Sequence, residues 1–172
     1  MEARHSEKPF AEAFLSPLGW IALVGCGRRL QRLSFGHATR EQALGAVGLR
    51  ADGQVSTRWS RALVRRIGDY AAGRPDDLRD VEVDWQTRSA FQRSVYEACR
   101  AIPYGQTRSY GQLAREVGAV GAARAVGNCM AANRIPLVVP CHRVVPASGR
   151  LGRFSAPGGV AMKRRLLKME SR

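Results

Sequence analysis

The sequence predicts an α/β (α+β) protein of two domains, with a small sheet-plus-helix domain over residues 1–86 and a mainly helical domain over residues 87–172. A chain of 172 residues is long enough for one compact domain or two small ones. Short strand-like runs dominate the first half, and helical periodicity dominates the second. Charge divides at the same place, because the first half carries 13 basic and 11 acidic residues whereas the second carries 15 and 3.

The N-terminal half opens with a predicted hairpin. Its strands are residues 10–15 and 20–24, and the intervening Ser16-Pro17-Leu18-Gly19 is typical of a turn. Residues 29–35 carry further apolar side chains and add a third strand. We expect these three segments to form the small sheet of the first domain.

Helices complete the first domain. Residues 39–47 are predicted to be helical. A longer amphipathic helix is predicted over residues 56–73, because apolar residues recur there at three- and four-residue spacing: Trp59, Leu63, Ile67 and Tyr70. A run of Gly, Pro and Asp over residues 73–77 ends it. Residues 81–85 are predicted to form a further strand, and the linker to the second domain is expected near residues 84–89.

The C-terminal half contains a helix-turn-helix candidate. A first helix, with Phe91, Val95, Ala98 and Ile102 on its inner face, ends at Pro103. Ser109 can cap a short helix over residues 110–117, and residues 118–121 join it to a helix over residues 122–132. A plain structural hairpin has the same pattern. The surplus of basic residues in this half nevertheless favours binding to a polyanion, of which nucleic acid is the commonest.

Residues 135–145 carry the chemistry. Apolar residues on both sides predict a buried, extended strand, yet Cys141-His142-Arg143 lies in its middle. Burying three polar groups is costly unless they pair with one another or with a ligand. Adjacent residues of a regular strand point to opposite faces, so coupling Cys141 to His142 needs a turn after Pro140 or a bridging water. The alternative is a structural cysteine beside a hydrogen-bonded histidine.

Motifs over residues 85–170 resemble those of the O6-alkylguanine-DNA alkyltransferases, also called methylated-DNA–protein-cysteine methyltransferases. These repair proteins take an alkyl group from guanine onto a cysteine. Their signature is Pro140-Cys141-His142-Arg143-Val144, and the other matching segments are Ile102–Gly105, Ser109–Ala114, Ala122–Gly127 with Asn133, and Gly158-Gly159 with Lys163, Leu166-Leu167 and Glu170. The first half resembles the family only in length and in its order of strands and helices.

The resemblance implies a role for each of five residues. Cys141 is the nucleophile, and His142 is its base through a water molecule. Glu170 orients His142, as the third member of a triad does. Asn133 braces the turn before the active-site strand. Tyr110 donates a proton near guanine N3, so that the purine can leave.

The resemblance also implies how damaged DNA is held. The helix-turn-helix docks in the minor groove of double-stranded DNA and the O6-alkylguanine is flipped out, with activity on O4-alkylthymine left open. Arg124 fills the gap in the stack, and small residues let the second helix approach the sugar–phosphate chain: Ala122, Ala123 and Gly127. The substrate pocket is formed by Met130, Val144, Phe154 and Ser155. The alkyl group stays on Cys141, so each molecule acts once.

Composition limits the remaining possibilities. No apolar run approaches the roughly 20 residues of a membrane span, and the first residues have no apolar signal region. We therefore expect a DNA-associated cytoplasmic monomer that can cluster cooperatively on DNA. The cysteines and histidines lack zinc-ligand spacing, so no metal and no cofactor are expected. Two other functions stay open: a non-catalytic sensor of alkylation damage, and a helix-turn-helix DNA-binding regulator.

Overall fold

The computed structural model describes residues 8–50 and 55–171, which fall into two compact units. One unit comprises residues up to 74 together with residues 81–84, and the other comprises residues 75–80 and those from 85 onward. The chain therefore passes between the units three times.

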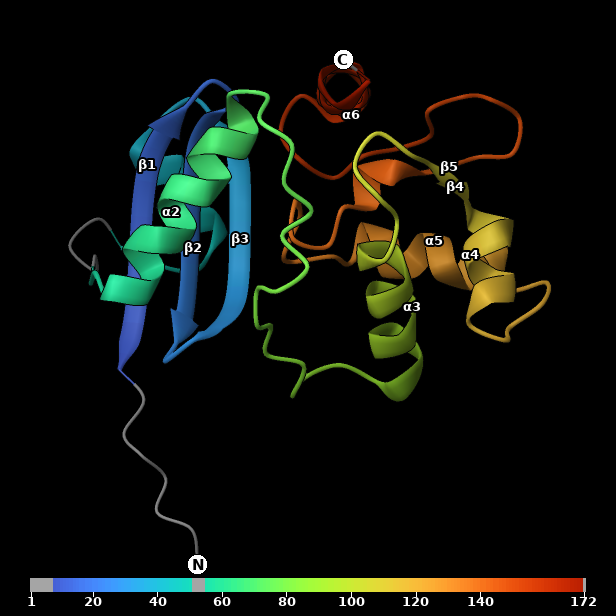
Figure 1. Cartoon of the computed structure of the whole chain (residues 1–172), viewed down its shortest axis with the longest axis horizontal. Helices are drawn as coiled ribbons and strands as arrows, with labels where there is room; N and C mark the ends of the chain where they lie inside the picture. Colours follow the sequence, from blue (N-terminus) through green and yellow to red (C-terminus); the bar gives the residue numbers. More distant parts are fainter. Residues whose placement is uncertain (1–7, 51–54, 172) are drawn as a thin grey trace, which may run out of the picture. The chain divides into compact units, whose positions relative to one another are not determined.

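The first unit is built on a three-stranded antiparallel sheet in the order β1-β2-β3 (Figure 1). Its strands are β1 (Pro9–Ser16), β2 (Gly19–Cys26) and β3 (Arg29–His37). The predicted hairpin and third strand are confirmed, each slightly longer than expected. In the tight turn, the Ser16 hydroxyl accepts from the Leu18 amide at 3.1 Å and donates to the Gly19 carbonyl at 2.8 Å.

Two helices pack on this sheet. They are α1 (Arg40–Ala46) and α2 (Arg58–Ala71), which confirms both predicted helices. Helix α1 covers the side of Ala22, where it buries Ala43 and Leu44. Helix α2 packs against β1, where the rings of Trp59 and Phe10 lie 5.2 Å apart.

The strand predicted over residues 81–85 is wrong. This segment forms a single bridge to the sheet, in which the Leu30 amide donates to Glu82 O and the Asp84 amide donates to Leu30 O, both at 2.9 Å. Residues 75–80 before it and Trp85 after it belong to the second unit. The chain is therefore beside β3 too briefly for a ladder to form.

The second unit is mainly helical. It contains α3 (Ala90–Arg100), β4 (Arg108–Ser109), α4 (Tyr110–Glu116), α5 (Ala123–Ala131), the 3-10 helix η1 (Cys141–Arg143), β5 (Val144–Val145) and α6 (Gly159–Glu170). Helices α4 and α5 form the predicted helix-turn-helix. Gly118 and Gly121, with φ of 73° and 83°, supply the left-handed residues of its turn.

Hydroxyl residues set where four of the helices begin. Each N-cap side chain accepts the third helical amide, and the third side chain returns a bond to the cap: Thr39 with Gln42, Thr57 with Ser60, Ser89 with Gln92, and Ser109 with Gln112. Such a cap contributes about 1 kcal/mol. The Ser109 cap fixes the position of Tyr110, the first residue of α4.

The sequence predicts an extended strand at Cys141, but the structure has a turn of 3-10 helix there. The Arg143 amide donates to Pro140 O at 2.9 Å and closes η1, and strand geometry begins only at Val144. Strand β5 then pairs in parallel with β4, with Ser109 opposite Val145. This pairing brings the start of α4 beside the segment that carries Cys141.

Candidate active site

The Cys141-His142-Arg143 segment is almost completely buried, with exposed fractions of 5%, 0% and 1%. Successive side chains of a 3-10 helix point about 120° apart, because it has three residues per turn. Cys141 therefore faces a cavity, whereas His142 and Arg143 both reach Glu170 at the end of α6. The turn thus separates the thiol from the charged groups behind it.

Glu170 gathers donors from three residues. One oxygen lies 2.8 Å from His142 Nε2 and 3.0 Å from an Arg143 Nη atom, and the other accepts from Arg143 Nε at 3.0 Å and from the Gly105 amide at 3.2 Å. A carboxylate paired with a guanidinium only accepts, so Nε2 carries the imidazole proton and Nδ1 keeps the lone pair. Burial lowers the pKa of His142, against the opposing effect of Glu170. The ring is neutral and can act as a base.

Arg143 ties this network to the rest of the unit. One Nη atom donates to Asp77 Oδ1 at 3.1 Å and to the Ile102 carbonyl at 2.7 Å. Asp77 also accepts from the Tyr104 amide at 2.7 Å. Sequence reasoning missed Asp77 and gave Arg143 no role. The signal was present in Arg143 itself, because a buried arginine requires several acceptors.

Cys141 lies between groups with opposing effects on its thiol. Burial raises the pKa of Cys141, while a hydrogen bond from Asn133 and the charge of Lys163 act to lower it. Asn133 also spans the preceding turn: its Nδ2 donates to Val139 O at 2.8 Å, and its Oδ1 accepts from the Ile135 amide at 2.9 Å. Asn133 thus links the two ends of the segment from Ile135 to Val139, and its bracing role stays a prediction.

Lys163 is a functional candidate that sequence reasoning treated only as part of the C-terminal helix. It is 1% exposed, its Nζ donates to Val144 O at 2.6 Å, and the ammonium lies 6.0 Å from the centre of the Tyr110 ring. Burial lowers the pKa of Lys163, and the negative charge of a Cys141 thiolate would raise it. The ammonium and a thiolate therefore stabilise each other.

Cys141 opens into a cavity of about 540 Å³. The cavity is lined by Tyr110, Gly127, Asn128, Met130, Ala131, Cys141, Pro146, Gly152, Arg153, Phe154 and Ser155. Met130, Phe154 and Ser155 are thus brought together as the sequence predicts. Val144 is not among them, because it is fully buried and its carbonyl is taken by Lys163. Pro146 lines the cavity instead.

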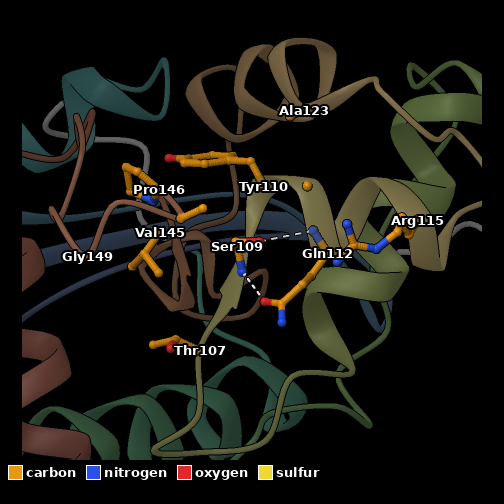
Figure 2. A pocket seen from close by; sticks show the side chains of 11 residues that line it. Thr107, Ser109, Tyr110, Gln112, Arg115, Ala123, Val145, Pro146 and Gly149 are labelled. Carbon is orange, nitrogen blue, oxygen red and sulfur yellow. Dashed lines mark hydrogen bonds between the residues drawn. The ribbon is translucent and has the colours of Figure 1, made fainter.

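Tyr110 also lines a second cavity, of about 710 Å³. Figure 2 shows it between the start of α4 and the segment after β5, with the Tyr110 ring beside Pro146 and the capping bonds of Ser109 and Gln112. Tyr110 and Pro146 line both cavities. Burial raises the pKa of Tyr110, so the phenol keeps its proton.

The residues predicted to hold DNA lie at the start and along one side of α5. Arg124 is exposed, and Ala122, Ala123 and Gly127 are half-buried. Ala123 lines the second cavity and Gly127 lines the first. A Cβ at Gly127 would lie 3.9 Å from the Tyr110 ring, an ordinary contact, so internal packing does not require glycine there.

Other kinds of site find little support among residues 8–50 and 55–171. These residues contain no group of three or more His, Cys, Asp or Glu side chains able to hold a metal ion. The four cysteines are free thiols. No helix in the described part of the chain is both long and apolar enough to cross a membrane.

Comparisons with known proteins agree with this geometry. The family model for the DNA-binding domain of 6-O-methylguanine DNA methyltransferase matches residues 90–172. The methylated-DNA–protein-cysteine methyltransferase of Mycolicibacterium paratuberculosis is 41% identical over 157 residues, covering 91% of this chain and 89% of the relative. The protein of the same name from Salmonella typhimurium is 38% identical, covering 92% and 94%.

Solved structures give the same result. The crystal structure of Mycobacterium tuberculosis O6-methylguanine methyltransferase superposes with a TM-score of 0.76 at 38% identity, covering 95% of this chain and 93% of that one. The M. tuberculosis OGT structure in complex with DNA gives a TM-score of 0.72 at 37% identity, covering 94% and 92%.

Proposed function

This chain belongs to the methylated-DNA–protein-cysteine methyltransferase family and is a DNA-binding repair protein that transfers alkyl groups to cysteine. We propose that Cys141 accepts the alkyl group and that O6-alkylguanine donates it. One observation supports this most strongly. Cys141 lines the cavity while its neighbour His142 is held by the Glu170 carboxylate at 2.8 Å. This arrangement supports the assignment of Cys141 as nucleophile, neutral His142 as base and Glu170 as the carboxylate that orients it.

The reaction is a displacement at the alkyl carbon. His142 Nδ1 removes the thiol proton through a water molecule, and the imidazolium is stabilised by Glu170. The thiolate forms the Sγ–C bond as the C–O6 bond breaks, and the electron pair leaves on guanine. Tyr110 supplies a proton at N3. Reversal would require an unactivated thioether to expel the Cys141 thiolate, a poor leaving group, so the alkyl group stays on Cys141 and each molecule acts once.

Burial makes the base necessary. Desolvation raises the pKa of the Cys141 thiol, and an ordinary thiol is already mostly protonated at neutral pH. The Lys163 ammonium and the Asn133 amide offset part of this effect. In the proposed mechanism, they stabilise the thiolate once His142 has removed the proton.

DNA is held by the helix-turn-helix in the proposed complex. The small residues of α5 approach the backbone through the minor groove, and Arg124 enters the stack where the damaged nucleotide is flipped out, which costs a few kcal/mol. The cavity of Figure 2 receives the neighbouring backbone, since it shares Tyr110 with the reactive cavity and carries the exposed Arg115. Phosphate contacts make this binding sensitive to salt and tolerant of sequence.

Intact mass after incubation with a duplex oligonucleotide bearing one O6-methylguanine tests the proposal. The expected result is a gain of one methylene per chain, which Cys141→Ser abolishes. Cys129→Ser is the matched control, because Cys129 is also buried but does not line the reactive cavity. An unchanged wild-type mass with lesion binding retained would instead identify a non-catalytic damage sensor. Replacing the lesion with O4-methylthymine tests whether the pyrimidine adduct is also a substrate.

A further inference from the structure

Resting on the function just argued, we propose that Arg153 gives this protein a preference for alkyl adducts that carry a carboxylate, such as O6-carboxymethylguanine. Three features support this preference: the charge of the reactive cavity, the placement of Arg153 at its mouth, and the partners of its guanidinium.

The reactive cavity has a positive mouth. Among the described residues that line it, Arg153 alone is permanently charged, and none is Asp or Glu. Met130, Pro146 and Phe154 provide apolar walls. An anionic substituent that enters with the flipped base therefore meets a cation and no repelling carboxylate.

The backbone holds Arg153 in this place. Gly152, directly before it, has a φ of 73°, and a Cβ there would come within 3.1 Å of the Pro146 ring and 3.7 Å of the Tyr110 hydroxyl. The segment therefore lies close against two cavity-lining residues, and a side chain at position 152 would be strained at this φ and would require the Pro146 ring to shift by a few tenths of an ångström. Arg153 follows immediately and is exposed, so its long side chain extends from the cavity's edge.

The Arg153 guanidinium is available to a ligand. Within residues 8–50 and 55–171 it makes no hydrogen bond, ion pair or ring contact, whereas Arg143 reaches Glu170, Asp77 and Ile102. A guanidinium presents two parallel N–H donors that match the two oxygens of a carboxylate.

Pairing of Arg153 with the carboxylate of the adduct would favour the transfer reaction. In a carboxymethyl adduct the carboxylate is bonded to the carbon that Cys141 attacks, so thiolate and carboxylate repel each other as they approach. The Sγ–CH₂ bond forms, the CH₂–O6 bond breaks with its electron pair leaving on guanine, and S-carboxymethylcysteine remains. Arg153 neutralises the carboxylate throughout and lowers this repulsion. A methyl adduct has no such charge and gains nothing from it.

The test compares two adducts of nearly equal size and different charge, with O6-methylguanine as a smaller neutral reference. Single-turnover transfer rates are measured on duplexes carrying O6-carboxymethylguanine, its neutral carbamoylmethyl analogue, or O6-methylguanine. The readout is each protein's rate on the carboxymethyl adduct divided by its rate on the carbamoylmethyl adduct. We expect Arg153→Gln to lower this ratio about tenfold, since a charged hydrogen bond is lost, and Arg153→Lys to restore part of it.

Arg150→Gln is the matched control. Arg150 is exposed in the same segment and lines neither cavity, so its removal takes away the same charge and should leave the ratio at the wild-type value. An unchanged ratio in Arg153→Gln would overturn the proposal. So would an equal loss on all three adducts, which would make Arg153 a phosphate contact. Failure of the wild type to take methyl from O6-methylguanine would overturn the proposed function instead.

Discussion

Replacing Glu170 with Gln tests the network behind the nucleophile most directly. The substitution keeps the shape of the side chain but converts one acceptor oxygen into an NH₂ group. Both oxygens of Glu170 accept bonds, from His142 Nε2 and from two nitrogens of Arg143. In either orientation, the new amide therefore points a donor at another donor.

The magnitude follows from burial. The side chains of His142, Arg143 and Glu170 are at most 1% exposed, so water cannot replace the lost acceptor. Breaking a buried ion pair by removing one partner costs about 3–5 kcal/mol. Arg143 keeps Asp77 and the Ile102 carbonyl, which places the expected loss near the lower end, about 3 kcal/mol. In a chain of this length, that lowers Tm by about 6–12 °C.

The assay pairs stability with activity and uses Glu97→Gln as its control. Glu97 forms an ion pair of 2.9 Å with Arg93, but both side chains are about half exposed, so the same substitution there should cost under about 0.5 kcal/mol. Urea unfolding gives the two stabilities. The single-turnover transfer rate of folded Glu170→Gln should fall about a hundredfold, because the imidazolium loses its carboxylate. Equal stabilities would refute the buried-pair argument, and an unchanged rate would refute the orienting role.

Three further outcomes are expected. Tyr110→Phe should lower the transfer rate about a hundredfold while a gel-shift assay shows DNA binding retained, because only the proton donor is lost. The free energy of unfolding should fall as pH drops below about 6.5, because burial lowers the pKa of His142 in the folded state and the unfolded state therefore binds the extra proton first. Thermal unfolding of His142→Gln should accordingly depend less on pH. Methylation of Cys141 should lower Tm, as calorimetry can show, because the added methyl group must be fitted around a side chain that is only 5% exposed.

Local signals in the sequence predicted most of the fold. The Ser16–Gly19 turn, the Ser109 cap and the glycine turn of the helix-turn-helix are each decided by a few adjacent residues. The segment over residues 81–85 was predicted wrongly for the converse reason. Its composition suits a strand, but whether a ladder forms depends on where the chain goes before and after it, which local pattern does not contain.

Site residues that belong to recognisable motifs were predicted from the sequence, whereas those brought in by contacts between distant segments were not. The motifs pointed to Cys141, His142 and Glu170. In the structure His142 is bonded to Glu170 at 2.8 Å and Cys141 lines the cavity, while their catalytic roles stay a prediction. Asp77 was missed because it lies 66 residues from Arg143 in a segment with no motif. The resemblance placed Val144, the last residue of the signature, in the pocket, but its carbonyl accepts a bond from Lys163, a tertiary contact that the motif does not reveal.

Helix α6 holds the nucleophile's turn from both ends. Lys163 and Glu170 are seven residues apart, two helical turns, and therefore lie on the same face of α6. Glu170 binds the two residues that follow Cys141, and Lys163 binds the carbonyl of the next one, Val144. A single helix thus fixes the base, stabilises the thiolate and anchors the strand after the turn. Because Cys141 begins the turn that α6 holds, crowding around its alkyl group should be transmitted first to α6, the element on which the rest of the site depends.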